Sequence, residues 1–254
     1  MIVEAIKHAL VRAPNYLKRM GYVKESIAID YRYKRCKEHW DSHLNKCKTF
    51  IIDALKNIPD GSKVVIIGSG GLYDVPIEVL IEHKMEITCI DIVHQTHAKR
   101  KARNFKFIAQ DITSLIKPVY YYIEHNEPLP DSFDPQVIFP YKADLIISLN
   151  ILSQLPINMM RYAEEKNRPL PESFEHDVIK VHLHWLFDQK TAIVLISDIE
   201  RKYFKDKDYS STEKALPNLE TLQNPLDQWQ WDLAPAGEID KNMHVTHTVG
   251  AWRL

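Results

Sequence analysis

The pattern of apolar and polar positions changes near residue 60. From residue 36 to residue 55 the apolar side chains recur at steps of three or four, which predicts an amphipathic helix with one buried stripe. That stripe consists of Cys36, Trp40, Leu44, Cys47, Ile51 and Leu55. Pro59 and Gly61 end the helix, because proline disfavours a helical residue before it and glycine favours a turn. The first 60 residues are therefore expected to be helical.

After residue 60, short apolar runs alternate with helical spacing. The run 64–67 is continuously apolar, as in a strand buried on both faces of a parallel sheet. Further strands are expected over 86–91, 105–108, 144–148 and 191–197, with helices over 72–83, 94–103 and 172–187. This alternation predicts βαβ units on a parallel sheet with right-handed crossovers.

Two regions depart from the alternation. The segments 229–233 and 244–249 are extended in pattern and are separated by turn-forming residues, which predicts a C-terminal antiparallel hairpin. Residues 117–142 form an insertion rich in proline and tyrosine that is longer than a typical connection. Such a length favours a functional loop.

Composition narrows the class of protein. The 254 residues are 45% hydrophobic and 26% charged, which excludes collagen-like, disordered and disulfide-scaffold chains. The formal charge is -1, yet residues 1–50 carry 11 Lys+Arg against 5 Asp+Glu, so a basic N-terminal quarter precedes an acidic body. Three cysteines without a C-x-x-C pair favour reduced, buried thiols and no metal site. With no apolar run of membrane-spanning length and no signal-peptide pattern, we expect a cytoplasmic protein without a membrane partner.

A glycine-rich loop follows the first predicted strand. Gly68, Ser69, Gly70 and Gly71 stand where a backbone can turn tightly and lie against a ligand. The dinucleotide fingerprint would need glycine in place of Tyr73, and the loop also lacks the lysine of a phosphate-binding loop. Tight packing of the strand on the following helix is the alternative explanation.

Polar side chains follow the next three strands. Asp91 ends the second strand, where an acid can accept both hydroxyls of a ribose. Asp111 lies just beyond the third strand, and Asn150 lies at the end of the fourth, although it could also cap a helix. Because ligands of open α/β sheets bind at the carboxyl ends of the strands, these residues are predicted to share one site.

The chain resembles the class I S-adenosylmethionine-dependent methyltransferases. The resemblance covers about residues 60–254 and rests on the phrases VVIIGSGG, CIDIV, AQDI and ADLIISLNILSQLP and on the closing hairpin. It implies an α/β fold with a doubly wound, mostly parallel seven-stranded sheet, a C-terminal antiparallel hairpin and an N-terminal helical cap. The expected division is a cap over 1–60 and a Rossmann-like domain over 61–254.

The resemblance also implies a cofactor, S-adenosyl-L-methionine, and the residues that hold it. The glycine loop (Gly68, Ser69, Gly70 and Gly71) would contact the methionine and ribose, Asp91 and Ile92 the ribose, Asp111 and Ile112 the adenine, and Asn150 the methyl group. A cation of the cap could hold the methionine carboxylate, and Arg32 and Arg35 are the candidates. The chain departs from the family at Ile66, where an acid is common, and at Leu72, where the third glycine of the loop would stand.

The substrate side is less marked in the sequence. Ser153, Gln154 and Trp40 are candidates for facing the acceptor, and the first two could equally be exposed helix residues. Ser197 and Asp198 are expected to close the fifth strand as a helix cap, followed by a surface ion pair of Glu200 and Arg201. His182 and His184 do not share a helix face, and His244 and His247 are expected to be structural. No catalytic residue can be named.

The expected function is methyl transfer by in-line displacement to an unidentified acceptor, with a small molecule favoured because the basic excess is local. One alternative is an RNA or protein methyltransferase that docks through the basic N-terminal helix. Another is a protein that kept the fold and binds without turnover. A nicotinamide-dependent oxidoreductase is disfavoured by Tyr73 and by the C-terminal hairpin.

Overall fold

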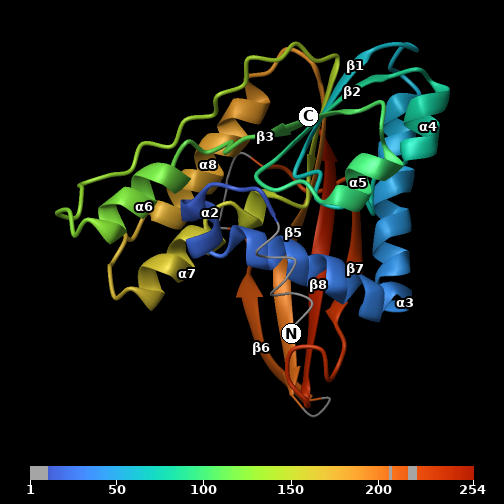
Figure 1. Ribbon diagram of the computed structural model, residues 1–254. Coiled ribbons are helices and arrows are strands. Elements are labelled where there is room, and N and C mark those ends of the chain that lie inside the picture. The colour runs from blue at the N-terminus through green and yellow to red at the C-terminus, as the bar shows by residue number, and fades with distance from the viewer. Residues whose placement is uncertain (1–10, 206–207, 217–221) are drawn as a thin grey trace.

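The computed structural model describes residues 11–205, 208–216 and 222–254, so the first ten residues of the predicted helical segment lie outside it. Strands and helices alternate after residue 60, as predicted (Figure 1). The helices are α2 (Asn15–Arg19), α3 (Tyr22–Leu55), α4 (Ile77–Glu82), α5 (Thr96–Lys101), α6 (Ile116–Glu124), the short 3-10 helix η1 (Leu152–Gln154), α7 (Ile157–Glu165) and α8 (Phe174–Phe187). The strands are β1 (Lys63–Ile67), β2 (Glu86–Asp91), β3 (Lys106–Ala109), β4 (Leu145–Leu149), β5 (Ala192–Lys205), β6 (Asp208–Lys214), β7 (Asp227–Ala234) and β8 (Met243–Arg253). Among the described helices, none has the length and apolarity that crossing a membrane requires.

The strands form one sheet in the order β3-β2-β1-β4-β5-β8-β7. The first five of these strands are parallel, β8 runs antiparallel to β5, and β7 runs antiparallel to β8. The doubly wound, mostly parallel sheet with a C-terminal antiparallel hairpin is therefore confirmed. One strand was not predicted: β5 continues to Lys205, and its second half pairs with β6.

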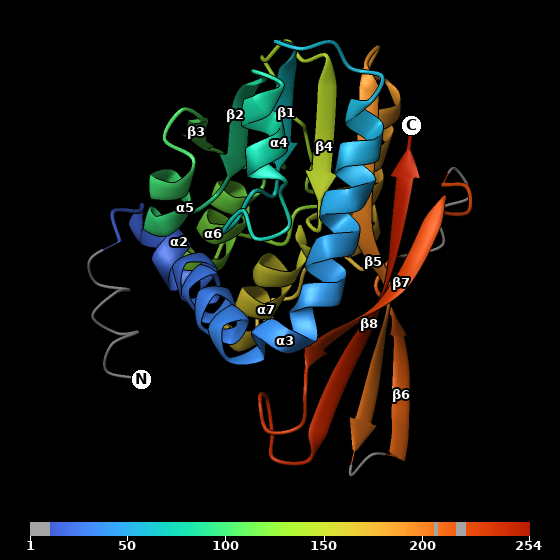
Figure 2. The ribbon, with the colours of Figure 1, turned by 90° about the vertical axis from the view of Figure 1, so that its right-hand side faces the viewer.

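Apolar side chains on both faces of the sheet fix the layers. Alternate residues of a strand point to opposite faces, so Val64 and Ile66 enter one core while Val65 and Ile67 enter the other. The first core lies against α3, α4 and α5, and the second against α6, α7 and α8 (Figure 2). Ile66, one of the two departures from the family pattern, is thus a fully buried core residue.

Helix α3 serves both the core and the cavity described below. All six residues of the predicted apolar stripe are buried, which confirms that prediction. The helix is kinked at Cys36, where φ is -106° and ψ is 19°. Beyond the kink it packs along the sheet, whereas the part before the kink crosses beneath the carboxyl ends of the parallel strands (Figure 2).

The basic N-terminal quarter faces acids of the C-terminal hairpin. The pairs are Arg35 with Glu238 (2.9 Å), Arg32 with Glu238 (3.4 Å), His39 with Asp232 (2.5 Å) and Lys46 with Asp227 (3.5 Å). Each such surface pair contributes little stability on its own. Together they show that part of the basic excess of the N-terminal quarter is paired with acids of the C-terminal hairpin.

The insertion 117–142 begins inside α6 and continues without regular structure. Its aromatic side chains pack on α8: the ring of Phe133 lies 5.7 Å from that of Phe174, and the ring of Phe139 lies 4.8 Å from that of Trp185. The segment, all of which is described, supplies no wall of the cavity below. Its structural role is to cover α8.

Candidate functional site

A cavity of about 370 Å³ opens between the carboxyl ends of the parallel strands and the first half of α3. This volume is in the range of sites for small ligands. Of the predicted site residues, the following line it: Gly68, Ser69, Gly70, Gly71, Asp91, Ile92, Asp111, Ile112, Asn150, Gln154 and Trp40. Two predicted residues, Arg35 and Ser153, are not part of its lining.

The loop after β1 follows the backbone path of a glycine loop at two positions, Gly68 and Leu72. Gly68 has φ of +78°, and a Cβ there would lie 2.6 Å from the carbonyl oxygen of Leu149 and 2.7 Å from Cβ of Ile151. Leu72, where the family has glycine, adopts φ of +58°, the left-handed conformation that glycine would supply without strain. The backbone path of a glycine loop is therefore kept although the residue is leucine.

Asp91 ties the end of β2 to this loop. Its carboxylate accepts hydrogen bonds from the backbone N–H of Gly70 (2.7 Å), Ile92 (2.7 Å) and Val93 (3.4 Å). Burial raises the pKa of the Asp91 carboxyl, and the N–H donors oppose that rise. The carboxylate faces the cavity as a hydrogen-bond acceptor, which is what a ribose hydroxyl requires.

Asp111 is placed at the cavity but is already engaged. One oxygen accepts from the backbone N–H and the hydroxyl of Thr113 (2.8 and 2.7 Å), and the other accepts from the N–H of Ile116 (2.9 Å). The acid therefore fixes the turn that leads into α6 and presents Ile112 to the cavity.

Asn150 follows β4 in a left-handed conformation, with φ of +50°. Asparagine tolerates this conformation better than most residues. Its side-chain amide donates to Asp74 (2.8 Å). Its carbonyl oxygen is buried and has no hydrogen-bond partner within the described residues. Nδ2 of the same amide lies 3.4 Å from Nε2 of His43.

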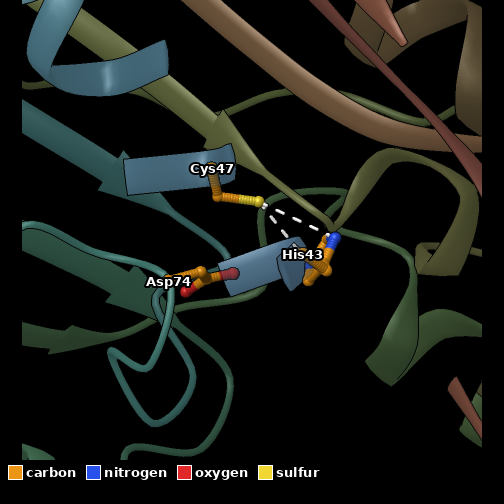
Figure 3. Close-up of side chains that lie close together, drawn as sticks. All are labelled: His43, Cys47 and Asp74. Carbon is orange, nitrogen blue, oxygen red and sulfur yellow. Dashed lines mark hydrogen bonds between the residues drawn. The ribbon is translucent and has the colours of Figure 1, made fainter. Parts of the chain in front are cut away.

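Three side chains near Asn150 could be taken for a metal site (Figure 3). One nitrogen of His43, Sγ of Cys47 and a carboxylate oxygen of Asp74 lie within 4.8 Å of one another. However, Nδ1 of His43 accepts a hydrogen bond from the indole N–H of Trp229 (3.1 Å), so the proton of the neutral ring sits on Nε2. Nε2 then has no lone pair for a metal, and a metal-binding histidine would instead donate from its other nitrogen. The donor set does not fit a metal ion.

The charge states of this cluster agree with that conclusion. Burial lowers the pKa of His43 to about 3 and raises the pKa of the Cys47 thiol well above its ordinary value. Burial also raises the pKa of Asp74. The imidazole and the thiol are thus neutral near pH 7.

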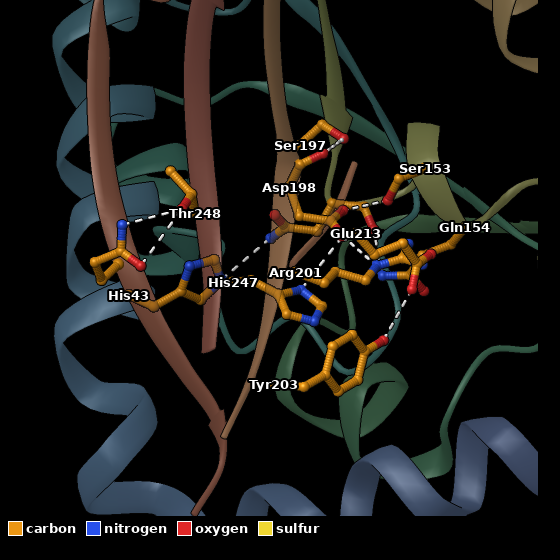
Figure 4. A network of polar contacts seen from close by, with 12 residues as sticks. His43, Ser153, Gln154, Ser197, Asp198, Arg201, Tyr203, Glu213, His247 and Thr248 are labelled. Carbon is orange, nitrogen blue, oxygen red and sulfur yellow. Dashed lines mark hydrogen bonds and ion pairs between the residues drawn. The ribbon is translucent and has the colours of Figure 1, made fainter. Parts of the chain in front are cut away.

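The end of the cavity under β5 contains a polar network that the sequence did not reveal (Figure 4). Asp198 is buried within a continuing strand, so the predicted helix cap is wrong. The predicted surface ion pair of Glu200 and Arg201 is also wrong, because Arg201 pairs with Asp198 and Glu213.

The Asp198 carboxylate accepts from Nε of Arg201 (3.0 Å) and from the hydroxyl of Ser153. Ser153 therefore supports the cavity wall from behind. His247, expected to be structural, lines the cavity.

The two arginines proposed for the cofactor carboxylate lie differently. Arg35 is half exposed and is held by Glu238, away from the cavity. Arg32 lines the cavity, and its Nε lies 3.4 Å from the same glutamate. The structure thus favours Arg32 by position.

Several polar atoms around the cavity are buried without a hydrogen-bond partner in the described part of the chain. They are the hydroxyls of Tyr22 and Ser69, the side-chain carbonyls of Gln95 and Asn150, the indole N–H of Trp231, Nε of Arg32 and Nδ1 of His247. The last two lie at ion-pair distance from Glu238 and Asp198, respectively, but outside hydrogen-bond geometry. Because buried polar groups are nearly always paired, this gathering indicates a polar ligand that pairs with them.

The strand order and the reversed terminal hairpin are those that the resemblance to class I methyltransferases implies. No family model and no curated protein matches the chain. The plantazolicin methyltransferase BamL is similar at a TM-score of 0.39 and 15% identity, over 78% of this chain and 59% of that one. The 1,6-didemethyltoxoflavin-N1-methyltransferase of Burkholderia thailandensis is similar at 0.37 and 13%, over 81% and 77%.

YjhP from E. coli is similar at a TM-score of 0.31 and 13% identity, over 62% of this chain and 49% of that one. This chain therefore spans about half the length of YjhP and somewhat more of BamL. Likenesses at such identities concern the fold alone.

Proposed function

We propose that the protein binds S-adenosyl-L-methionine in the cavity and transfers its methyl group to a small-molecule acceptor. One observation carries the proposal: the glycine loop after β1, Asp91 after β2 and the turn at Asp111 after β3 converge on a single cavity. The BamL and didemethyltoxoflavin methyltransferase structures contain S-adenosylhomocysteine, which agrees with this use of the fold. Tyr73 in place of a third glycine disfavours a dinucleotide.

The residues present fit such a cofactor. Gly68 lets the loop pack closely on the backbone after β4, and Gly70 has open space where a Cβ would stand, so a ligand can approach it. Asp91 offers acceptor oxygens to ribose hydroxyls, and Ile92 and Ile112 form apolar walls for a purine ring. Arg32 would hold the methionine carboxylate, in preference to Arg35. The bound sulfonium supplies an activated methyl group, so the chain has to hold the acceptor in line and exclude water.

A small acceptor is supported by the pairing of charges. Three cations of α3, Arg32, Arg35 and Lys46, face acids of the C-terminal hairpin. Such paired cations attract a polyanion less than free ones. A strong and salt-sensitive affinity for RNA would contradict the small-molecule acceptor.

Calorimetric titration with S-adenosylmethionine and S-adenosylhomocysteine tests the proposal. We expect binding of both, and a loss of about 10- to 100-fold in D91N, because hydrogen bonds to a charged group contribute roughly 1.5–3 kcal/mol. D53N is the matched control, since Asp53 is an exposed acid that pairs with Arg253 outside the cavity. Absence of binding to either ligand would refute the proposal, and binding without transfer to any acceptor would favour a non-catalytic protein.

A further inference from the structure

Three neighbouring strands place a row of functional side chains across the sheet. Arg201 of β5 lies directly opposite His247 of β8, and His247 lies directly opposite Trp231 of β7. Directly opposed residues on neighbouring strands share one face of a sheet. All three line the cavity at the end away from Asp111.

A β-bulge adds Asp198 to this row. Residues three apart in a regular strand point to opposite faces, so Asp198 and Arg201 would be separated by the sheet. The register of β5 against β8 shifts between Asp198 and Glu200, which leaves Ile199 as an extra residue. Asp198 is consequently opposite Val249, two residues from His247 and on the same face.

Asp198 and His247 form a buried pair. Nδ1 of His247 lies 3.3 Å from a carboxylate oxygen of Asp198, and the two residues are only 8% and 4% exposed, respectively. Burial raises the pKa of Asp198, but the contacts with His247, Arg201 and Ser153 outweigh burial and hold it well below its ordinary value. An ionised carboxylate at Nδ1 keeps the ring proton there.

The other nitrogen of His247 is left for a ligand. The ion pair of the His247 ring is at Nδ1, no hydrogen bond within the described residues engages Nε2, and the side chain lines the cavity. The charged and titratable groups that face His247 are Asp198 and Arg201 from β5 and the neutral His43 from α3, whereas β7 contributes the uncharged Trp231. His43 cannot take the same role, because Nδ1 accepts from Trp229 and Nε2 carries the proton.

We infer that His247 is the general base of the reaction, oriented by Asp198, and that the acceptor carries a protic O–H or N–H group. This inference rests on the proposed function. The oxygen or nitrogen forms a bond to the methyl carbon, the carbon–sulfur bond breaks, and its electron pair stays on sulfur. The proton of the acceptor passes to Nε2, giving an imidazolium beside the Asp198 carboxylate, and then leaves to solvent. A sulfide or a tertiary amine would need no such base.

The tautomer of His247 tests the inference without any acceptor. In nitrogen-15 NMR spectra of the histidine side chains at pH 7.5, with H247Q used for assignment, we expect a protonated Nδ1 and a bare Nε2. D198N should remove the carboxylate that holds the proton at Nδ1 and so mix the two tautomers. A protonated Nε2 in the wild type would overturn the inference. This measurement is made on the wild type, so it does not depend on whether D198N folds.

Transfer provides the second measurement. In a radiometric assay with a tritiated methyl donor and a set of phenols and aromatic amines, any probe that the wild type methylates should lose about 100-fold in H247Q. H244Q is the matched control, because His244 lies on the same strand, pairs with Asp232 and does not line the cavity. Transfer that survives in H247Q would overturn the inference. S-adenosylhomocysteine binding should be unchanged in H247Q, and its absence in the wild type would refute the proposed function instead.

Discussion

The left-handed Leu72 gives a quantitative test of how the glycine loop is held. Leu72 is 1% exposed and has φ of +58°, so two effects oppose each other when it is replaced. Removing a buried leucine side chain costs roughly 2–5 kcal/mol of unfolding free energy. Only glycine also relieves the left-handed strain, which is about 1–2 kcal/mol for other residues.

Leu80 of α4 is the matched control, because it is 0% exposed and helical. In a helix glycine is worse than alanine by about 1 kcal/mol. At each position the loss of unfolding free energy in the glycine variant is compared with the loss in the alanine variant. This glycine-minus-alanine difference should be larger at position 80 than at position 72 by about 1–2 kcal/mol, after allowing for the greater freedom of glycine in the unfolded chain.

Urea unfolding of the four variants, compared by their midpoints at a common slope, measures this double difference. If glycine and alanine differ by as much at position 72 as at position 80, the strain at Leu72 is not what distinguishes the loop. In that case the loop conformation would have to be attributed to burial of the side chain alone.

Three further predictions follow from the site and the core. Burial lowers the pKa of His182 to about 4, below the unfolded value of 6.5, so its contribution to stability is present above pH 6.5 and is lost as the pH falls. Between pH 6 and 5 the unfolding free energy should drop by about 1 kcal/mol more in the wild type than in H182Q, and equal urea profiles would contradict this. R32Q should weaken S-adenosylhomocysteine binding by about 10-fold in calorimetry, while R35Q leaves it within about twofold. Equal losses in the two variants would show that lining the cavity is not what makes an arginine of α3 bind the carboxylate. Zn²⁺ should leave the melting temperature unchanged, because His43 has no free lone pair, and a rise with Zn²⁺ concentration would show that the cluster rearranges to bind it.

Much of the fold could be predicted because its periodicities are strong. The continuous apolar run of β1 and the three-four spacing of α3 each admit one interpretation, and both are confirmed. The helix expected from Leu72 is wrong at its start, since α4 begins only at Ile77. The left-handed Leu72 and the proline at position 76 account for this, because neither continues a helix upstream.

The end of the cavity beside the glycine loop was predictable and the end beneath β5 was not. Asp91 and Asn150 follow apolar strands, so their positions at the sheet edge could be derived from the chain. Beyond Ser197 the sequence of β5 loses its apolar run, and β6 is exposed at every residue, so nothing local indicates a strand. The pairing with β8 decides that region, and such long-range pairing has no local signature. One signal could have drawn attention to His43, its spacing of four from Cys47.

The extra residue at Ile199 has a consequence for comparing this chain with relatives. An aspartate and an arginine with one residue between them in a regular strand would reach the same face as the Asp198 and Arg201 found here with two. Loss of Ile199 would remove the bulge and leave that regular spacing, so Asp198 and Arg201 would still share a face. A relative with one residue fewer between the two could therefore keep the same pair on the same face, so an alignment of this strand must allow a gap of one residue at Ile199.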